Sequence, residues 1–118
     1  MAEQIILNTD LYDNLLTERK GDYTAKPRIT GTLYNTDIAA RIVAARTEYQ
    51  HGTILNILDM ADSHKVQAIA EGKSVVDGVG QYLVNVQGAF EGEKAQFEPG
   101  KHALGITYTM GKLLRETL

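Results

Sequence analysis

The sequence has no cysteine, no tryptophan and only two prolines among its 118 residues. Without cysteine, the chain can form neither a disulfide nor a thiolate zinc site, and it offers no cysteine nucleophile. Aromatic residues make up only 7% of the chain, so a core built by one copy would be aliphatic and small. A homodimer that shares its core would remove that limit.

Long apolar runs and a signal peptide are also absent. No run approaches the roughly 20 apolar residues of a membrane-spanning helix, and residues 1–4 lack the basic and apolar start of a secretory signal. These features predict a cytoplasmic protein with no membrane contact. The formal net charge is −3 and the pI about 5.5, which disfavours simple electrostatic binding to nucleic acid. The densest basic group consists of Arg19, Lys20, Lys26 and Arg28.

Residues 1–20 carry a weak pattern that leaves two options open. Residues 5–7 fit a short strand, because three apolar residues follow one another. Leu11, Leu15 and Leu16 fit one helical turn instead, because Leu11 and Leu15 lie four residues apart. Both options stay open at this point.

Residues 23–34 follow a turn signal at residues 21–22 and have the character of an extended segment. Pro27 has no backbone N–H to donate to a ladder, so an edge strand is favoured over a central one. We expect residues 1–34 to form an N-terminal extension within a single domain, of which residues 35–118 are the main part.

Two helices are predicted next. The first begins near residues 35–37, where Asn or Thr can cap the free amides and Asp suits the positive end of the helix. Residues 47–50 match a capping box, which predicts a break at Thr47 and a second helix over residues 48–71. Gly72 can close that helix in the left-handed conformation. The second helix has a broad apolar stripe, which indicates burial against several neighbours: Ile54, Leu58, Ala61, Ala68 and Ile69.

The stretch after Gly72 predicts paired strands around a tight bend. Gly78 and Gly80 lie where a strand must bend or let another backbone approach closely. Residues 82–87 alternate between two faces, which is the periodicity of a strand. Residues 88–102 predict a loop or a short hairpin, because they contain several glycines and a proline.

The end of the chain predicts one more strand and one more helix. Residues 103–108 have the apolar, β-branched and aromatic character of a strand. The Thr109 hydroxyl can cap a final helix over residues 110–118. Helices and strands are both predicted, and the expected fold class is α+β.

This order of elements resembles the bacterial histone-like HU and integration host factor family, and two local motifs support the resemblance. Residues 78–82 (Gly-Val-Gly-Gln-Tyr) resemble the family's Gly-Phe-Gly-Ser-Phe bend. Residues 109–114 (Thr-Met-Gly-Lys-Leu-Leu) are similar to its Lys-Ala-Gly-Lys-Ala-Leu segment at the start of the last helix. The resemblance covers about residues 36–118.

The chain is more similar still to a divergent HU-like branch with an N-terminal extension. That branch has a Tyr-Thr-Ala segment before the first helix, here residues 23–25, and a Gly-Xaa-Phe-Xaa-Gly segment after the hairpin, here residues 88–92. Residues 97–102 resemble the same part of that branch. The resemblance implies an intertwined homodimer with two N-terminal helices, an antiparallel β-saddle with a short arm, and a C-terminal helix.

The resemblance also implies contact with double-stranded DNA. HU arms wrap the minor groove, and a proline at each tip kinks the duplex. The arm here lacks the Arg-Asn-Pro tip, and it sets Glu91, Glu93 and Glu98 against Lys94 and Lys101. The candidate DNA-contacting residues are Lys94, Lys101, His102, Lys112, Arg115, Lys26 and Arg28.

Each candidate has a plainer interpretation. The lysines and arginines also fit a solvated surface, and Phe90 and Phe97 fit packing of the arm onto its own body better than stacking on bases. His51, His64 and His102 have no partner at ligand spacing, so we expect no metal site. Neither glycine-rich stretch fits a nucleotide loop, and no catalytic constellation stands out. We therefore predict no enzyme activity, no cofactor and no small-molecule substrate.

Two functions follow. The first is a nucleoid-associated, HU-like protein that contacts the DNA backbone with little sequence preference. The second keeps the dimer but makes it a structural or protein-interaction module without DNA. The resemblance favours the first function, and the acidic charge balance favours the second.

Overall fold

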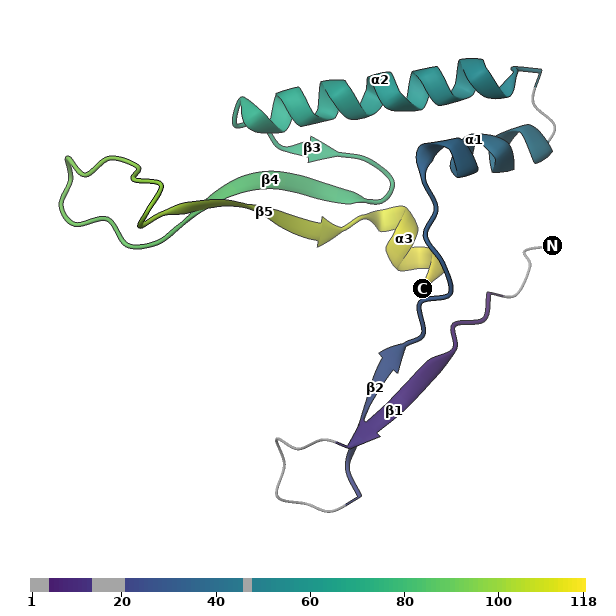
Figure 1. Cartoon of the computed structure of the whole chain (residues 1–118), viewed down its shortest axis with the longest axis horizontal. Helices are drawn as coiled ribbons and strands as arrows, with labels where there is room; N and C mark the ends of the chain where they lie inside the picture. Colours follow the sequence, from purple (N-terminus) through teal and green to yellow (C-terminus); the bar gives the residue numbers. More distant parts are fainter. Residues whose placement is uncertain (1–4, 14–20, 46–47) are drawn as a thin grey trace. The chain divides into compact units, whose positions relative to one another are not determined.

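The computed structural model describes residues 5–13, 21–45 and 48–118 (Figure 1). These residues form two compact units, Met1–Tyr34 and Asn35–Leu118. Each unit is described below by itself. The second unit combines three helices with an antiparallel sheet, so the predicted α+β class is confirmed.

The N-terminal unit is a two-stranded antiparallel sheet of β1 (Thr9–Asp13) and β2 (Tyr23–Pro27). The strand predicted at residues 5–7 is wrong, because β1 starts at Thr9 and pairs through Leu11 with Ala25. Leu11 therefore lies in a strand and not in the alternative helical turn, whereas Leu15 and Leu16 lie outside the described residues. Both strands of such a sheet are edges, which confirms the edge position of Pro27.

Two helices open the second unit, α1 (Asn35–Ala44) and α2 (His51–Ala70). The predicted start of α1 is confirmed. The predicted start of α2 is wrong by three residues: its N-cap is Gln50, without a side-chain cap bond, and Thr47 lies outside the described residues. At this start, the His51 Nε2 lies 2.8 Å from the Thr36 carbonyl oxygen, which ties α2 to α1.

The C-terminal end of α2 follows the prediction. Gly72 has a φ of +89°, which only glycine adopts at no steric cost. Its N–H donates to the Ile69 carbonyl at 2.9 Å, and the Lys73 N–H donates to the Ala68 carbonyl at 3.0 Å. These two bonds satisfy carbonyls that the end of the helix would otherwise leave open.

The sheet of this unit has the order β3 (Val75–Val76), β4 (Gly80–Gln87) and β5 (Ala103–Met110), all antiparallel. Gly80 pairs with Met110 at one end of the β4–β5 ribbon. A Cβ at Gly80 would overlap the Tyr108 ring and lie 2.9 Å from the Thr109 carbonyl oxygen. The predicted close approach of another backbone is therefore confirmed at Gly80.

The last helix, α3 (Lys112–Thr117), is shorter than predicted, and its N-cap is Gly111. The predicted cap at Thr109 is wrong, because Thr109 and Met110 are still paired with β4 as the end of β5. The Gly111 N–H donates to the Val79 carbonyl at 2.9 Å. A Cβ at Gly111 would lie 2.7 Å from the neighbouring backbone, so this turn also depends on glycine.

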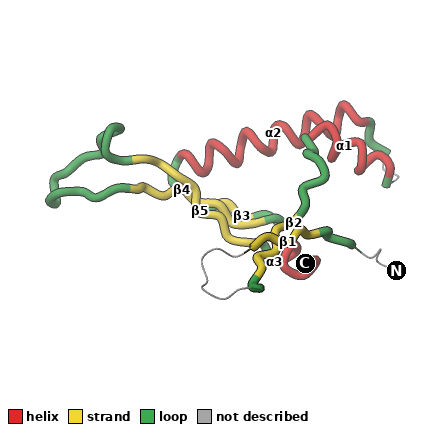
Figure 2. Tube along the Cα trace, turned by 60° about the horizontal axis from the view of Figure 1, so that its bottom comes forward, coloured by secondary structure: helices red, strands yellow, loops and turns green. Residues whose placement is uncertain are grey.

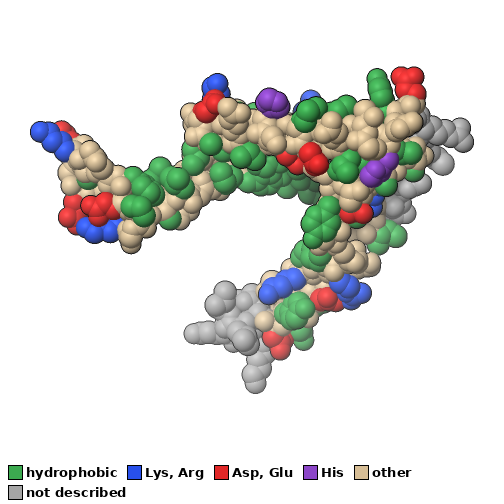
Figure 3. Space-filling model, turned by 45° about the horizontal axis from the view of Figure 1, so that its top comes forward, with side chains coloured by type: hydrophobic (Ala, Val, Ile, Leu, Met, Phe, Trp, Pro, Cys, Tyr) green, Lys and Arg blue, Asp and Glu red, His purple; other side chains and the backbone are tan. Residues whose placement is uncertain are grey.

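A single copy buries very little apolar surface. Within the described residues, the buried hydrophobic side chains are Ala39 and Ile54. Large apolar side chains remain exposed along α2 and the ribbon, including Ile57, Met60, Val66, Leu104 and Ile106. Figure 3 shows hydrophobic side chains gathered between α2 and the strands.

Replacing Gly80 with alanine tests the bend. Gly80→Ala is expected to lower the free energy of unfolding by about 1–3 kcal/mol, because the methyl group must displace the Tyr108 ring or the facing backbone. Urea denaturation measures the change. Gly52→Ala is the control, since no atom lies within 4 Å of a Cβ there and alanine suits helix α2. Equal stability of Gly80→Ala and the wild type would show that the bend tolerates a side chain.

Candidate nucleic-acid interface

The β4–β5 ribbon has two chemically different faces, because side chains alternate along each strand. We call the first the polar strip; it lies on the face that also carries Leu83, and it consists of Gln81, Asn85, Gln87, Thr107 and Thr109. We call the second the apolar face, and it consists of Tyr82, Val84, Val86, Leu104, Ile106 and Tyr108. Neither strand contains a charged residue. Charged groups near the ribbon therefore lie at its ends.

At one end, residues 88–102 form a folded tip between β4 and β5 (Figure 2). The predicted loop is confirmed, and it is closed by turns. The Lys101 and His102 N–H groups donate to the Glu98 carbonyl at 3.0 and 2.8 Å, and the Ala95 N–H donates to the Gly92 carbonyl at 3.3 Å. These backbone hydrogen bonds fold residues 88–102 into turns at the end of the ribbon.

His102 is the centre of the tip and is only 6% exposed. Its Nδ1 accepts the Glu98 N–H at 2.8 Å, so the neutral ring donates from Nε2 to the Ala89 carbonyl, also at 2.8 Å. The ring stacks on Phe90, with centroids 3.8 Å apart and planes 3° apart, and Phe97 lies 5.7 Å away. Both ring nitrogens are therefore engaged within the tip. Sequence spacing did not predict this role, because the partners lie up to thirteen residues away.

The two lysines of the tip lie at its surface beside acidic residues. The Lys101 ammonium is 3.4 Å from the Glu98 carboxylate, and both side chains are more than half exposed, so the pair contributes little stability. Among the residues that the structure describes, Lys94 has no ion-pair partner. Figure 3 shows basic and acidic side chains together at the end of the arm.

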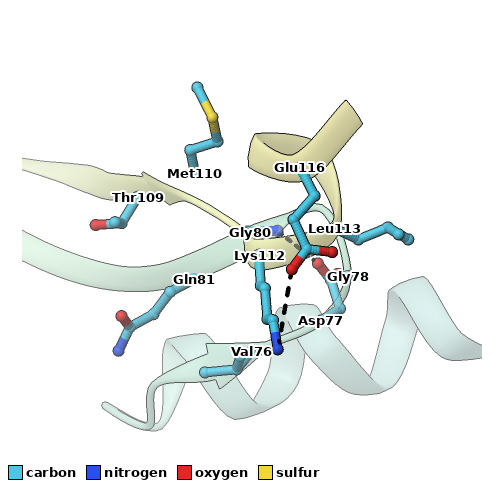
Figure 4. Close-up of a pocket in the computed structure, with 11 residues that line it drawn as sticks. Val76, Asp77, Gly78, Gly80, Gln81, Thr109, Met110, Lys112, Leu113 and Glu116 are labelled. Carbon is cyan, nitrogen blue, oxygen red and sulfur yellow. Dashed lines mark hydrogen bonds and ion pairs between the residues drawn. The ribbon is translucent and has the colours of Figure 1, made fainter. Parts of the chain in front are cut away.

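At the other end of the ribbon, α3 carries Lys112 and Arg115. The Lys112 ammonium lies 3.9 Å from the Glu116 carboxylate, and Arg115 donates to the Met110 carbonyl at 3.3 Å. Figure 4 shows Lys112 and Glu116 beside the bend, where a pocket of about 510 Å³ lies between α3, β4 and β5. The tip residues and the α3 residues thus form two separate groups.

Asp77 holds the bend that joins β3 to β4. Its Oδ1 accepts the N–H groups of Val79 and Gly80, each at 2.9 Å, and its own N–H donates to the Gly80 carbonyl at 2.9 Å. Its Oδ2 lies 3.0 Å from the Lys65 ammonium on α2. A single carboxylate therefore fixes the turn and ties it to the helix. The sequence signal for this role is an Asp before Gly between two strands, which our sequence interpretation missed.

The same contacts shift three pKa values. The Gly80 N–H and then Lys65 lower the pKa of Asp77. The hydrogen bond to Asp77 raises the pKa of Lys65. Partial burial, followed by the charge of Asp77, raises the pKa of the neighbouring Tyr82. Asp77 and Lys65 are therefore both charged in the folded protein near neutral pH.

Lys26 and Arg28 belong to the N-terminal unit. Arg28 pairs with Asp10 across the sheet at 2.5 Å, and this hydrogen bond raises the pKa of Arg28. The Lys26 ammonium lies 5.2 Å from the centre of the Tyr12 ring. Arg19 and Lys20 lie outside the described residues. Within the described residues, no three metal-ligating side chains come together, and no helix there has the length and apolarity to cross a membrane.

Neutralising Asp77 tests its role in the bend. Asp77→Asn keeps the shape but removes the charge, so it is expected to lower the free energy of unfolding at pH 7 by about 1–3 kcal/mol. Because the folded-state pKa of Asp77 is lowered, the wild type has this stability above about pH 4 and loses it as the pH falls through the folded value. The difference between wild type and variant should therefore shrink in acid.

Denaturant unfolding between pH 7 and about pH 2.5 measures this trend. Glu93→Gln makes the same chemical change at an exposed position of the tip and serves as the control. A difference between wild type and Asp77→Asn that stays constant across the pH range would contradict the charge-based account.

Comparison with known proteins places the chain in a family. The family model for an HU-type DNA-binding domain matches residues 6–118. Among solved structures, a Bacteroides vulgatus protein proposed to bind DNA has a TM-score of 0.77 at 19% identity, over 93% of this chain and 43% of that protein. This chain thus spans less than half the length of that relative.

HU of Anabaena, solved in complex with DNA, has a TM-score of 0.53 at 20% identity, over 71% of this chain and 95% of that one. Among curated proteins, none matches the sequence. At such identities the two structures show similarity of fold, whereas the family model covers nearly all of the chain. The chain belongs to the HU-like family of DNA-binding domains.

Proposed function

We propose that the protein is a nucleoid-associated, homodimeric binder of double-stranded DNA in the cytoplasm. It contacts the DNA backbone with little sequence preference. The observation that carries the proposal is the distribution of charge along the ribbon: basic residues lie at both ends, and the strands between them have none. With this distribution, the basic residues of the tip and those of α3 can each contact phosphates of the same duplex. The presence of DNA in the Anabaena HU structure supports the same function.

The phosphate contacts would come from both ends of the ribbon. Lys94 and Lys101 lie on the tip, and Lys112 and Arg115 lie on α3. His102 has a positioning role, because its hydrogen bonds and its stacking on Phe90 fix the tip. Lys26 and Arg28 would extend the contact from residues 1–34, which we propose to be an N-terminal extension of the domain formed by residues 35–118.

A second copy would cover the apolar surface that one copy leaves open. Leu104 and Ile106 on the apolar face are 65% and 55% exposed, and Ile57 and Met60 on α2 are about half exposed. Surfaces of this kind are expected at protein–protein contacts rather than in water. The dimer is therefore a condition of folding in this proposal.

No described feature suggests chemistry on a substrate, and the family is one of DNA-binding domains. We propose that the protein is not an enzyme and uses no cofactor or small-molecule substrate. The alternative function keeps the dimer as a structural or protein-interaction module. Its support is the charge, since the chain has a net charge of −3 and three glutamates accompany the two lysines of the tip.

Charge reversal at the tip separates the two functions. The double substitution Lys94→Glu and Lys101→Glu is expected to abolish binding to a generic duplex, because it replaces attraction to phosphates with repulsion. The control is Arg41→Glu with Lys73→Glu, which makes the same total change of charge on α1 and beyond α2.

A salt series with the wild type completes this test. The logarithm of the affinity should fall linearly with the logarithm of salt concentration, by about 0.9 per phosphate neutralised. Unchanged affinity of the tip variant would remove the tip from the mechanism. A wild-type dimer that binds no duplex even at low salt would favour the protein-interaction module.

A charge in the apolar stripe of α2 tests the shared core. Leu58→Asp is expected to unfold the protein, because the half-buried position would be covered by the second copy and cannot hold an unpaired charge. Asn56→Asp places the same charge at an exposed position of α2 and should leave the dimer intact. Circular dichroism and sedimentation measure folding and mass. A folded Leu58→Asp monomer would disprove the shared core.

A further inference from the structure

The hydrogen bonds of the tip hold the His102 ring in its neutral form. Its Nδ1 accepts the Glu98 N–H at 2.8 Å, so the lone pair that would take up a proton already faces a donor. Histidine has an ordinary pKa of about 6.5, which brings a change of charge within reach of mild acid. We propose that His102 is a pH-sensitive switch, in which protonation of the ring opens the folded tip. This inference concerns the structure of the tip and goes beyond the proposed function.

The ring joins the two halves of the tip. Its Nε2 lies 2.8 Å from the Ala89 carbonyl oxygen at the start of residues 88–102, whereas the Nδ1 bond holds Glu98 near their end. The Lys101 and His102 N–H groups donate to the Glu98 carbonyl at 3.0 and 2.8 Å. Glu98 is thus held at its N–H by the ring and at its carbonyl by the backbone. A change at Nδ1 therefore acts directly on the turn that closes the tip.

Protonation would place two donors face to face. In the imidazolium form both ring nitrogens carry a hydrogen and neither accepts. The new Nδ1–H would point at the Glu98 N–H, while the Nε2–H bond to the Ala89 carbonyl keeps the ring in place. A buried donor without an acceptor is costly. The charged ring must therefore leave its position, or Glu98 must move away from it.

Close packing restricts the ring while the tip is closed. Phe90 stacks on it with the centroids 3.8 Å apart, and Phe97 lies 5.7 Å away. Gly88 lies against its edge, where a Cβ would be 2.8 Å from the ring Cδ2. The stack on Phe90 tolerates either charge state, because a cation is attracted to the face of an aromatic ring. The contact at Nδ1 therefore determines which form the closed tip accepts.

Three charged side chains line a cavity of about 300 Å³ beside the ring, namely Glu91, Glu98 and Lys101. The Glu98 carboxylate lies 3.4 Å from the Lys101 ammonium, and both side chains are more than half exposed, so water screens their charges. The other charged residues of the tip, Glu93 and Lys94, do not line this cavity. Both hydrogen bonds of the ring go to backbone groups and not to a carboxylate. The direct contact at Nδ1 therefore outweighs the attraction of the glutamates for a charged ring.

The direction of the pH dependence follows from the number of bound protons. The closed tip holds a neutral ring, and an open tip exposes the ring to water, so the open form binds more protons in mild acid. The stability of the closed tip is therefore fully present above about pH 6.5 and falls as the pH drops below that value. Glutamate in water stays ionised down to about pH 4.3. The lowered pKa of Asp77 keeps the bend charged in the same range.

Nuclear magnetic resonance of the full-length protein tests the switch. As the pH falls from about 7.5 to about 5.5, backbone signals of Phe90, Glu98 and Lys101 should move together towards the positions of an unfolded chain. The signal of Val84 in β4 should stay in place. His64→Asn changes an exposed histidine of α2 and serves as the control, in which the transition of the tip should be the same as in the wild type.

Two variants of His102 separate the two ring nitrogens. His102→Asn keeps an acceptor near the place of Nδ1 and takes up no proton, so its tip is expected to stay closed at both pH values. His102→Gln keeps a donor near the place of Nε2 but has no acceptor for the Glu98 N–H, so its tip is expected to be open at both. Each variant loses the stack on Phe90, so the difference between them isolates the contact at Nδ1.

Three results would overturn the switch. The first is a wild-type tip that stays closed at about pH 5.5. The second is a transition that persists in His102→Asn, because another group would then cause it. The third is identical behaviour of His102→Asn and His102→Gln, because the acceptor at Nδ1 would then not determine whether the tip is closed.

The effect on DNA rests on the proposed function and is measured separately. An open tip no longer fixes Lys94 and Lys101, so the affinity of the wild type for a generic duplex should fall about tenfold between about pH 7.5 and about pH 5.5. Charge alone predicts the opposite, because added protons make the protein more positive. His102→Asn should not show the loss.

These measurements keep the switch and the proposed function apart. Opening of the tip with unchanged affinity would support the switch and contradict the contact of the tip with phosphates. A protein that binds no duplex at either pH would contradict the proposed function, and the resonance signals of the tip would still decide the switch.

Discussion

The carboxylate of Asp77 is the contact on which the second unit depends. It accepts two backbone N–H groups at the bend and meets the ammonium group of Lys65 on α2. The bend can close this tightly only because Gly80 and Gly111 bring two backbones together without side chains. The ribbon starts at this bend, and the Gly111 N–H donates to the Val79 carbonyl, which joins the start of α3 to the same bend.

The β4–β5 ribbon presents two chemically different faces. The apolar face meets α2 at Tyr82, and Leu104 and Ile106 on the same face remain more than half exposed. The polar strip lies on the opposite face. Cations at the tip and on α3 add charge at the ends of the strip. In the proposed function, these local cations would let a protein of net negative charge bind DNA, because the charge at the contact matters more than the net charge.

Local signals predicted the parts of the fold that depend on neighbouring residues, such as the start of α1 at Asn35 and the left-handed Gly72. The prediction failed where contacts between residues far apart in the sequence determine the structure. Thr109 fits a helix cap locally, yet pairing with β4 keeps it in a strand. His102 was expected at a DNA surface. Its ring is buried instead, because it contacts Ala89 and Phe90 at the other end of the tip segment. The resemblance identified the family, whereas the contact of Asp77 with Lys65 on α2 became apparent only in the three-dimensional structure.

Nuclear magnetic resonance tests the central claim most directly. On addition of a generic DNA duplex, backbone signals of the tip should shift together with those of Lys112 and Arg115 on α3. The backbone signals of Asn56 and Gln67 on α2 should stay in place. Shifts confined to the N-terminal unit or to α2, with the tip and α3 unchanged, would contradict the proposal of how this domain meets DNA.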